Sequence, residues 1–158
     1  MNQLILAIIL SILPISELRG GLPIAINYAI KKGVSIWPIF SLIVLVNIFA
    51  IFLAFLILDY LHKHLMKFKG YRKIFGFFLK RTQKKAKYVE KRMKIYGYLA
   101  LAIFVAVPIP ITGAWTGTLI AWLLGLDRKK SIWAIALGVL IAGVIVLLAT
   151  LGIINLLI

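Results

Sequence analysis

The sequence predicts an all-α polytopic membrane protein built as an inverted repeat, in which each repeat is a re-entrant helical hairpin followed by a transmembrane helix. Three observations predict this fold class: the composition, the position of proline and glycine within apolar segments, and an internal duplication. Of the 158 residues, 63% are hydrophobic and 15% are charged, and the mean hydropathy is +1.07. Soluble domains are nearer ~45–50% apolar and ~25% charged, so a bilayer is the natural solvent for this chain. We expect one membrane domain over residues 1–158.

The net charge is +15, and 13 of the 19 basic residues lie between Lys63 and Lys94. The remainder is almost free of charge, which favours a membrane protein with one basic loop over a nucleic-acid-binding protein. The absence of cysteine excludes disulfides and thiolate chemistry, and His62 and His64 alone make a poor metal site. The sequence has no phosphate-binding loop, dinucleotide fingerprint or catalytic triad. We therefore expect neither an enzyme nor a resident metal or cofactor.

Two segments are long and apolar enough to cross a bilayer. Ile36–Leu58 is uncharged for 23 residues and Ser131–Ile158 for 28. At 1.5 Å per residue, each can span a hydrocarbon core of ~30 Å, so both are predicted transmembrane helices. Trp37 and Trp133 begin these segments beside basic loops and are expected to be interfacial anchors.

Two other apolar regions, Leu4–Ile30 and Tyr98–Leu126, are interrupted near their centres by proline and glycine. The breaks cover residues 14–23 and 108–117. Proline and glycine at this density end a helix, and each remaining half is about 15 Å long, half the thickness of a bilayer. We expect re-entrant pairs of half-helices that meet near the midplane; the alternative is a kinked full span.

An internal repeat supports this interpretation. A shift of 96 positions, without gaps, superposes identical residues at both breaks and at both span entries. The matched pairs are Pro14 and Pro110, Ile15 and Ile111, Gly21 and Gly117, Ile24-Ala25 and Ile120-Ala121, and Ser35-Ile36-Trp37 and Ser131-Ile132-Trp133. We therefore expect a duplication.

The duplication divides the chain into repeat 1 (3–61), a connector (62–96) and repeat 2 (97–158). If each hairpin returns to its own side, each repeat crosses the membrane once, and the two repeats have opposite orientations. The positive-inside rule then places the connector in the cytoplasm of a prokaryotic cell and both termini outside the cell membrane.

The connector is itself predicted to be amphipathic. Apolar residues recur at helical spacing from Leu61 to Phe78 and again from Ala86 to Tyr96, with basic residues on the opposite faces. We expect the connector to lie on the membrane surface and to attract anionic lipid headgroups rather than nucleic acid. Membrane lipids are thus the expected partners, and a homodimer is left open.

Glu17 and Arg19 are the first candidates for a functional site. They are the ionisable residues at the tip of the first hairpin, and charges at membrane depth are costly enough to indicate function. The structural alternative is that the two charges pair with each other or only hold the shape of the hairpin.

The backbone at both breaks is expected to bind an anion. In the first break, Gly20 and Gly21 permit close backbone approach, and Pro23 suits the first turn of the outgoing half-helix. In the second break, Thr112 or Thr116 is expected to cap the matching half-helix, with Gly113 and Gly117 opening the backbone. Two helix N-termini and Arg19 would then converge on one polar cavity, and plain helix packing of the glycines is the alternative. The candidate site also contains Pro110 and Trp115, which are in the second break.

Two further polar residues fall within the spans. Asp59 is near the end of its helix, where Lys63 at i+4 is an expected partner. Asn47 lies mid-span and is expected either to form a hydrogen bond across helices or to line the substrate path.

The two breaks resemble the motifs of a known family. The motifs are Pro14-x-x-Glu17-Leu-Arg19-Gly20-Gly21-x-Pro23 and Val107-Pro108-x-Pro110-x-Thr112-Gly113-Ala114-Trp115-Thr116-Gly117. They resemble the putative small multidrug export protein family, within the wider DedA (VTT, SNARE-associated) superfamily, over nearly the whole chain. The resemblance implies two facing re-entrant hairpins, proton coupling, and transbilayer movement of lipids that include polyprenyl-phosphate carriers. By resemblance, Glu17 is the acid of the first hairpin, whereas the second hairpin lacks the arginine of the superfamily pattern.

The sequence thus leads to one main functional hypothesis and two alternatives. The main hypothesis is a transporter or flippase for an amphipathic anion, such as a phosphate-headed lipid, held by Arg19 and the helix ends. The first alternative is export of small cationic drugs in exchange for protons at Glu17. The second is a membrane scaffold without transport.

Overall fold

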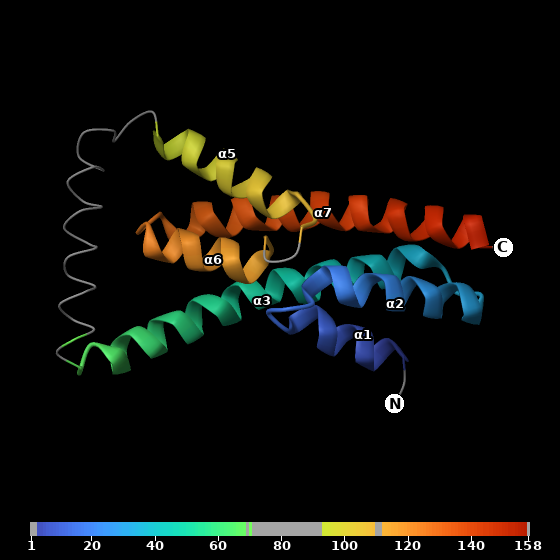
Figure 1. The fold of residues 1–158 in the computed structure, drawn as a ribbon, viewed down its shortest axis with the longest axis horizontal. Helices are drawn as coiled ribbons and strands as arrows, with labels where there is room; N and C mark the ends of the chain where they lie inside the picture. Colours follow the sequence, from blue (N-terminus) through green and yellow to red (C-terminus); the bar gives the residue numbers. More distant parts are fainter. Residues whose placement is uncertain (1–2, 69, 71–92, 110–111, 158) are drawn as a thin grey trace.

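The computed structural model describes residues 3–68, 70, 93–109 and 112–157, and every element in these ranges is a helix (Figure 1). The all-α fold class is therefore confirmed. The helices are α1 (Gln3–Ile12), α2 (Glu17–Lys32), α3 (Ile36–Leu65), α5 (Met93–Ala106), α6 (Ala114–Leu123) and α7 (Arg128–Leu157).

Helices α3 and α7 are the two elements of the described chain that are long and apolar enough to cross a membrane. Each has 30 residues, about 45 Å at 1.5 Å per residue, and the two helices run the length of the molecule in opposite directions (Figure 1). Many of their large apolar side chains are exposed, including Trp37 at 69% and Trp133 at 79%. The two predicted spans are confirmed as helices of membrane-spanning length.

The four short helices form two hairpins. Helices α1 and α2 occupy the half of the molecule that contains both chain termini, and α5 and α6 occupy the other half (Figure 1). The turns of the two hairpins meet near the middle of the long axis, beside α3 and α7. Thus the order short helix, break, short helix, long helix occurs twice in the described residues.

Both breaks are shorter than the sequence predicts. Helix α1 ends at Ile12 and α2 begins at Glu17, so Pro23 lies inside α2 and not in its first turn. A proline at this position removes only the N–H that would bond the carbonyl of Arg19, and packing of α2 against its neighbours keeps the helix continuous. The expectation for Pro23 was therefore wrong.

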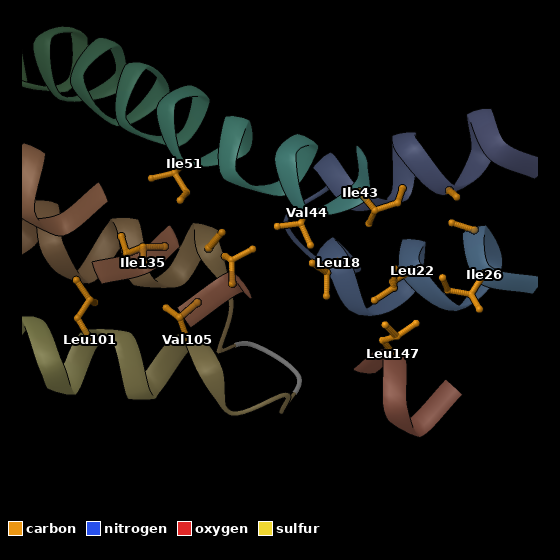
Figure 2. Close-up of a cluster of buried hydrophobic side chains, with 14 of the residues drawn as sticks. Leu18, Leu22, Ile26, Ile43, Val44, Ile51, Leu101, Val105, Ile135 and Leu147 are labelled. Atoms are coloured by element: carbon orange, nitrogen blue, oxygen red, sulfur yellow. The ribbon is translucent and has the colours of Figure 1, made fainter. Parts of the chain in front are cut away.

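The hairpins and the long helices share one core in the described residues, built from their inward faces. Figure 2 shows Leu18, Leu22 and Ile26 of α2 beside Ile43 of α3, and Leu101 and Val105 of α5 beside Ile135 of α7. These side chains are fully or almost fully buried.

The two hairpins pack differently. Helix α1 has its most extensive contacts with α2, whereas α5 packs mainly against α7. At Gly21 of α2 a Cβ would overlap the Ser11 hydroxyl and the backbone of Ala7, and at Gly138 of α7 a Cβ would press on the carbonyl of Ala102. The absence of side chains at these two glycines therefore allows both close contacts.

The predicted connector lies mostly outside the described residues. Its first residues continue α3 to Leu65, and its last ones begin α5 at Met93. The amphipathic faces predicted for residues 69 and 71–92 stay a prediction, as do Pro110 and Ile111 of the second break.

The end of α3 that faces the connector is tied to α6 and α7. Arg128 Nη2 lies 2.6 Å from Asp59 Oδ2, and Trp122 Nε1 donates to Asp59 Oδ1 at 2.9 Å. The side chain of Arg128 also lies over the Phe55 ring, 5.0 Å from its centroid. The expected partner Lys63 was therefore wrong: the structure brings Arg128 to Asp59 from 69 residues away.

Candidate functional site

Glu17 reaches from the first hairpin into the second. Its carboxylate accepts hydrogen bonds from the backbone N–H groups of Ala114 (3.2 Å) and Trp115 (3.1 Å), the first residues of α6. The side chain is 6% exposed. A carboxylate at this place satisfies two of the unpaired N–H groups of the helix and complements its positive end.

The backbone at Glu17 is unusual, because its φ of 46° falls in the left-handed region that residues other than glycine rarely adopt. Such a conformation costs about 1–3 kcal/mol and persists only where the surroundings impose it. Here it coincides with the turn into α2 that directs the carboxylate toward α6. Glu17 is thus held in a strained position by its contact with the second hairpin.

Gly113 is the N-cap residue of α6 and lies against the Glu17 carboxylate. A Cβ at position 113 would overlap both carboxylate oxygens. Positions 17 and 113 are separated by 96 residues, which is the period of the predicted repeat. The two positions therefore meet, and a side chain at position 113 would displace the Glu17 carboxylate.

Arg19 binds the opposite side of the second break. Its Nη2 donates to the backbone oxygens of Val107 (3.1 Å) and Thr112 (2.6 Å) and to Thr112 Oγ1 (3.0 Å). Val107 follows the last residue of α5, so the guanidinium lies at the negative end of that helix. The Nε and Nη1 groups of Arg19 have no acceptor among the described residues, and the side chain is only partly buried.

Thr112 does not cap α6 as the sequence suggested. Its hydroxyl donates to the carbonyls of Val107 (2.7 Å) and Ile109 (2.9 Å). It thus supports the end of α5 and the loop that Arg19 binds. The alternative capping residue, Thr116, lies inside α6, so the expectation of a threonine cap was wrong for both residues.

Trp115 makes the reciprocal contact to the first hairpin. Its indole Nε1 donates to the carbonyl of Ile12, the last residue of α1, at 2.9 Å. Each hairpin therefore supplies a donor to the C-terminal end of the other hairpin's first helix.

Asn47 of α3 forms a hydrogen bond to the end of α1, next to the first break. It is 1% exposed, and its Nδ2 donates to the carbonyl of Ser11 at 2.8 Å. Ser16 Oγ donates to the neighbouring carbonyl of Leu10 at 2.6 Å. With Trp115 bound to Ile12, three successive carbonyls at the end of α1 are satisfied by side chains.

A small cavity of about 10 Å³ lies where these groups meet, which is room for about one water molecule. It is much smaller than a lipid head group. The α6 N-terminus, expected to face an open anion cavity, is occupied by the protein's own Glu17 carboxylate. The cavity is lined by nine residues: Glu17, Leu18, Arg19, Asn47, Val105, Gly113, Ala114, Val139 and Ala142.

Comparison with known protein families is decisive for the classification. The sequence model of the family described as "Putative small multi-drug export protein" matches residues 17–145, which run from Glu17 at the start of α2 through the second hairpin and include most of α7. The chain belongs to this small multi-drug export family. Comparisons with curated proteins and with solved structures gave no significant match. Together with the two long apolar helices, the family indicates a membrane protein.

The structure brings together only some of the residues that the sequence singled out in this family member. Glu17, Arg19, Thr112, Gly113 and Trp115 meet at the contact between the hairpin tips. The remaining described candidates lie in the helices beside it: Gly20, Gly21 and Pro23 in α2, and Thr116 and Gly117 in α6.

Gly21 and Gly117 lie at helix contacts, against α1 and against Val105 of α5. Asn47 was expected either to form a hydrogen bond across helices or to line the substrate path, and its bond from α3 to Ser11 of α1 confirms the first expectation. Its position in the cavity lining, bonded to the end of α1 beside the first break, makes Asn47 part of the site.

Proposed function

We propose that this chain is a membrane transporter or flippase, not an enzyme, that moves an amphipathic substrate with an anionic, phosphate-like head group between the two hairpin tips. The observation that carries the proposal is that only one of the three guanidinium nitrogens of Arg19 is bonded to the described residues. Its Nη2 is engaged by the end of α5, while Nε and Nη1 have no partner among the described residues. A planar guanidinium edge of this kind is suited to binding a phosphate.

The contrast between Arg19 and Glu17 favours an anion over a cation. Glu17 is 6% exposed and accepts two backbone hydrogen bonds, whereas Arg19 is partly exposed. A substrate that approaches the tips therefore meets the guanidinium before the carboxylate. A cationic head group would be repelled by Arg19.

The arrangement of the hairpins supports a transport path at this place. We propose that both hairpins are re-entrant and that the repeats have inverted topology. Support comes from the hairpins' approach to the middle of the long axis from opposite ends (Figure 1), and from the 96-residue period that relates Glu17 to Gly113. Substrate sites between such repeats lie near the bilayer midplane.

The substrate class proposed is a phosphate-headed lipid such as a polyprenyl phosphate, in line with the resemblance to the DedA superfamily. Apolar side chains exposed along α3 and α7 would let the lipid tail stay in the bilayer while the head group passes the tips. The location that fits is the cell membrane, with the connector in the cytoplasm, membrane lipids as partners and anionic headgroups at the connector.

The description of the family supports a second candidate, the export of small cationic drugs in exchange for protons at Glu17. This function requires that the drug reach a carboxylate that is buried and already bonded to α6. The neighbouring guanidinium opposes it, so we rank it below anion transport.

Transbilayer movement in liposomes tests the proposal. A labelled polyprenyl phosphate, a labelled phospholipid and a cationic dye are compared for wild type, Arg19→Gln and Glu17→Gln, with and without a pH gradient. Lys32→Gln is the matched control, because it removes an exposed positive charge from the same helix.

We expect movement of a phosphate-headed lipid that falls about tenfold or more in Arg19→Gln and is unchanged in Lys32→Gln. Movement of the dye alone, with faster transport in Arg19→Gln, would support the cationic candidate. No movement of any probe by folded wild type would leave a scaffold as the better interpretation.

A further inference from the structure

The cavity between the hairpin tips has an unusual polar lining. Among the described residues that form it, the charged ones are Glu17 and Arg19, both from α2. The other helices contribute the amide of Asn47, the backbone of Gly113 and Ala114, and apolar side chains. Arg19 is thus the charged group that acts on Glu17 here.

Asn47 is only half satisfied in this cavity. Its Nδ2 donates to the carbonyl of Ser11 at 2.8 Å, which fixes the orientation of the amide. Its Oδ1 receives no hydrogen bond from the described residues, although only 1% of the residue is exposed. Asn47 is one of the residues that line the cavity, together with Glu17. A buried acceptor of this kind is poised for a donor.

We propose that Asn47 is a second hydrogen-bond partner of Glu17: on taking up a proton, the Glu17 carboxyl leaves the N-terminus of α6 and donates to Asn47 Oδ1. Ionised Glu17 has only acceptors and therefore binds the N–H groups of Ala114 and Trp115. Protonated Glu17 has one O–H donor, and Asn47, whose Oδ1 is an acceptor, lines the same cavity.

The exchange is balanced in atoms and charge. One proton from the aqueous phase adds to a carboxylate oxygen, two N–H···O bonds to α6 are lost, and one O–H···O bond to Asn47 forms. The site gains one positive charge. Two N–H groups at the positive end of α6 are then unoccupied, and Arg19 lines the same cavity as Ala114.

The exchange explains how a site closed by Glu17 could open for an anionic head group. Its use in transport rests on the proposed function, because only an anionic substrate gains from the vacated helix end. The hydrogen-bond exchange itself does not depend on any substrate. It can therefore be tested in the protein alone.

The test is the pH-difference infrared spectrum of the reconstituted full chain. The chain has only four carboxyl side chains, so the C=O band of protonated Glu17 is identified by its loss in Glu17→Gln. In Asn47→Leu we expect this band to move to higher wavenumber, and its midpoint to move about one pH unit toward acid. That shift corresponds to a loss of about tenfold in proton affinity, as expected for one lost hydrogen bond to the neutral form.

Thr118→Val is the matched control, because it removes another fully buried hydrogen-bonding side chain whose hydroxyl bonds Ala114 but does not line the cavity. The Glu17 band should be unchanged in this variant. An identical band and midpoint in Asn47→Leu and wild type would overturn the proposal. So would the absence of any Glu17 band over the pH range in which the protein stays folded.

Amide hydrogen exchange of wild type provides a second test that needs no Asn47 variant. After correction for intrinsic rates, exchange at Ala114 and Trp115 should accelerate across the pH range in which Glu17 is protonated. Equal protection on both sides of the transition would contradict the proposal. Loss of lipid transport in Arg19→Gln bears only on the proposed function, so the two can fail separately.

Discussion

Arg19 and Trp115 occupy equivalent positions 96 residues apart, and each donates a hydrogen bond to the C-terminal end of the first helix in the other hairpin. Arg19 binds Val107 beyond α5, and Trp115 binds Ile12 at the end of α1. The residues differ in chemistry, and their acceptors differ by one position at the 96-residue shift, because Val107 corresponds to Ser11 and Ile12 to Pro108. The two hairpins thus exchange donors, although an arginine provides one bond and a tryptophan the other.

Replacing Gly113 by alanine should remove the bond between Glu17 and α6. The new Cβ would overlap the carboxylate, and two charge-assisted hydrogen bonds would be lost. We expect the free energy of unfolding to fall by about 2–4 kcal/mol. Unfolding in detergent micelles, followed by circular dichroism, measures this. Gly152→Ala is the control, because its Cβ would meet no other atom within 4 Å; equal losses in both variants would contradict the interpretation.

Trp115→Phe keeps most of the ring and deletes the indole N–H. The carbonyl of Ile12 loses its donor, so unfolding should become easier by about 1 kcal/mol. Trp133→Phe, at a side chain that is 79% exposed, should change stability by less than about 0.5 kcal/mol. Thermal unfolding of both variants in the same detergent checks the difference, and similar losses would argue against a structural role for the bond.

Asp59→Asn should weaken the contact between α3 and α7 in a salt-dependent way. The ion pair with Arg128 is partly exposed, with side chains 42% and 53% accessible, so its loss should cost about 0.5–1 kcal/mol at low salt. The amide oxygen can still accept from Trp122. At high salt the variant and wild type should converge. Lys63→Gln should have no effect at either salt concentration, and an effect there would restore the i+4 pair as the relevant one.

Single cysteines can test whether the hairpins are re-entrant, because the chain has no native cysteine. With both hairpins re-entrant, Gln3→Cys and Val34→Cys should react with a membrane-impermeant maleimide from one side of the membrane. Tyr96→Cys and Leu124→Cys should react only from the other side. All four positions are exposed in the structure. Labelling of positions 3 and 34 from opposite sides would instead indicate a kinked full span.

The sequence was sufficient to predict the helical elements, because their signals are local. The length of the uncharged runs predicts α3 and α7, and the dense proline and glycine place both breaks near the middle of the apolar regions. Exact helix ends were less predictable. Pro23 is a helix breaker by its own chemistry, but it is tolerated in α2 where neighbouring helices hold the segment.

The partners of the polar residues could not be predicted, because they are supplied by distant parts of the chain. Glu17 was recognised from its charge, but its acceptor role at α6 joins positions 97 and 98 residues apart. A local rule such as the i+4 pair chose Lys63 for Asp59, whereas folding supplies Arg128. Asn47 could be noticed as polar, yet only the folded structure shows that the nitrogen of its side-chain amide, and not the oxygen, is engaged.

The exchange of bonds between the hairpins also has a consequence for biosynthesis. Glu17 enters the membrane about 97 residues before its partner Ala114 has been made, and at ~5–20 residues per second this takes about 5–20 s. During that time the nascent first hairpin carries the Glu17 carboxylate and the Arg19 guanidinium without their backbone partners, because α6 and the end of α5 have not yet been made. Such a half-made protein is expensive to leave in lipid, so it should remain beside the insertion machinery until the second hairpin arrives. Synthesis of the second half is thereby the step that releases the first.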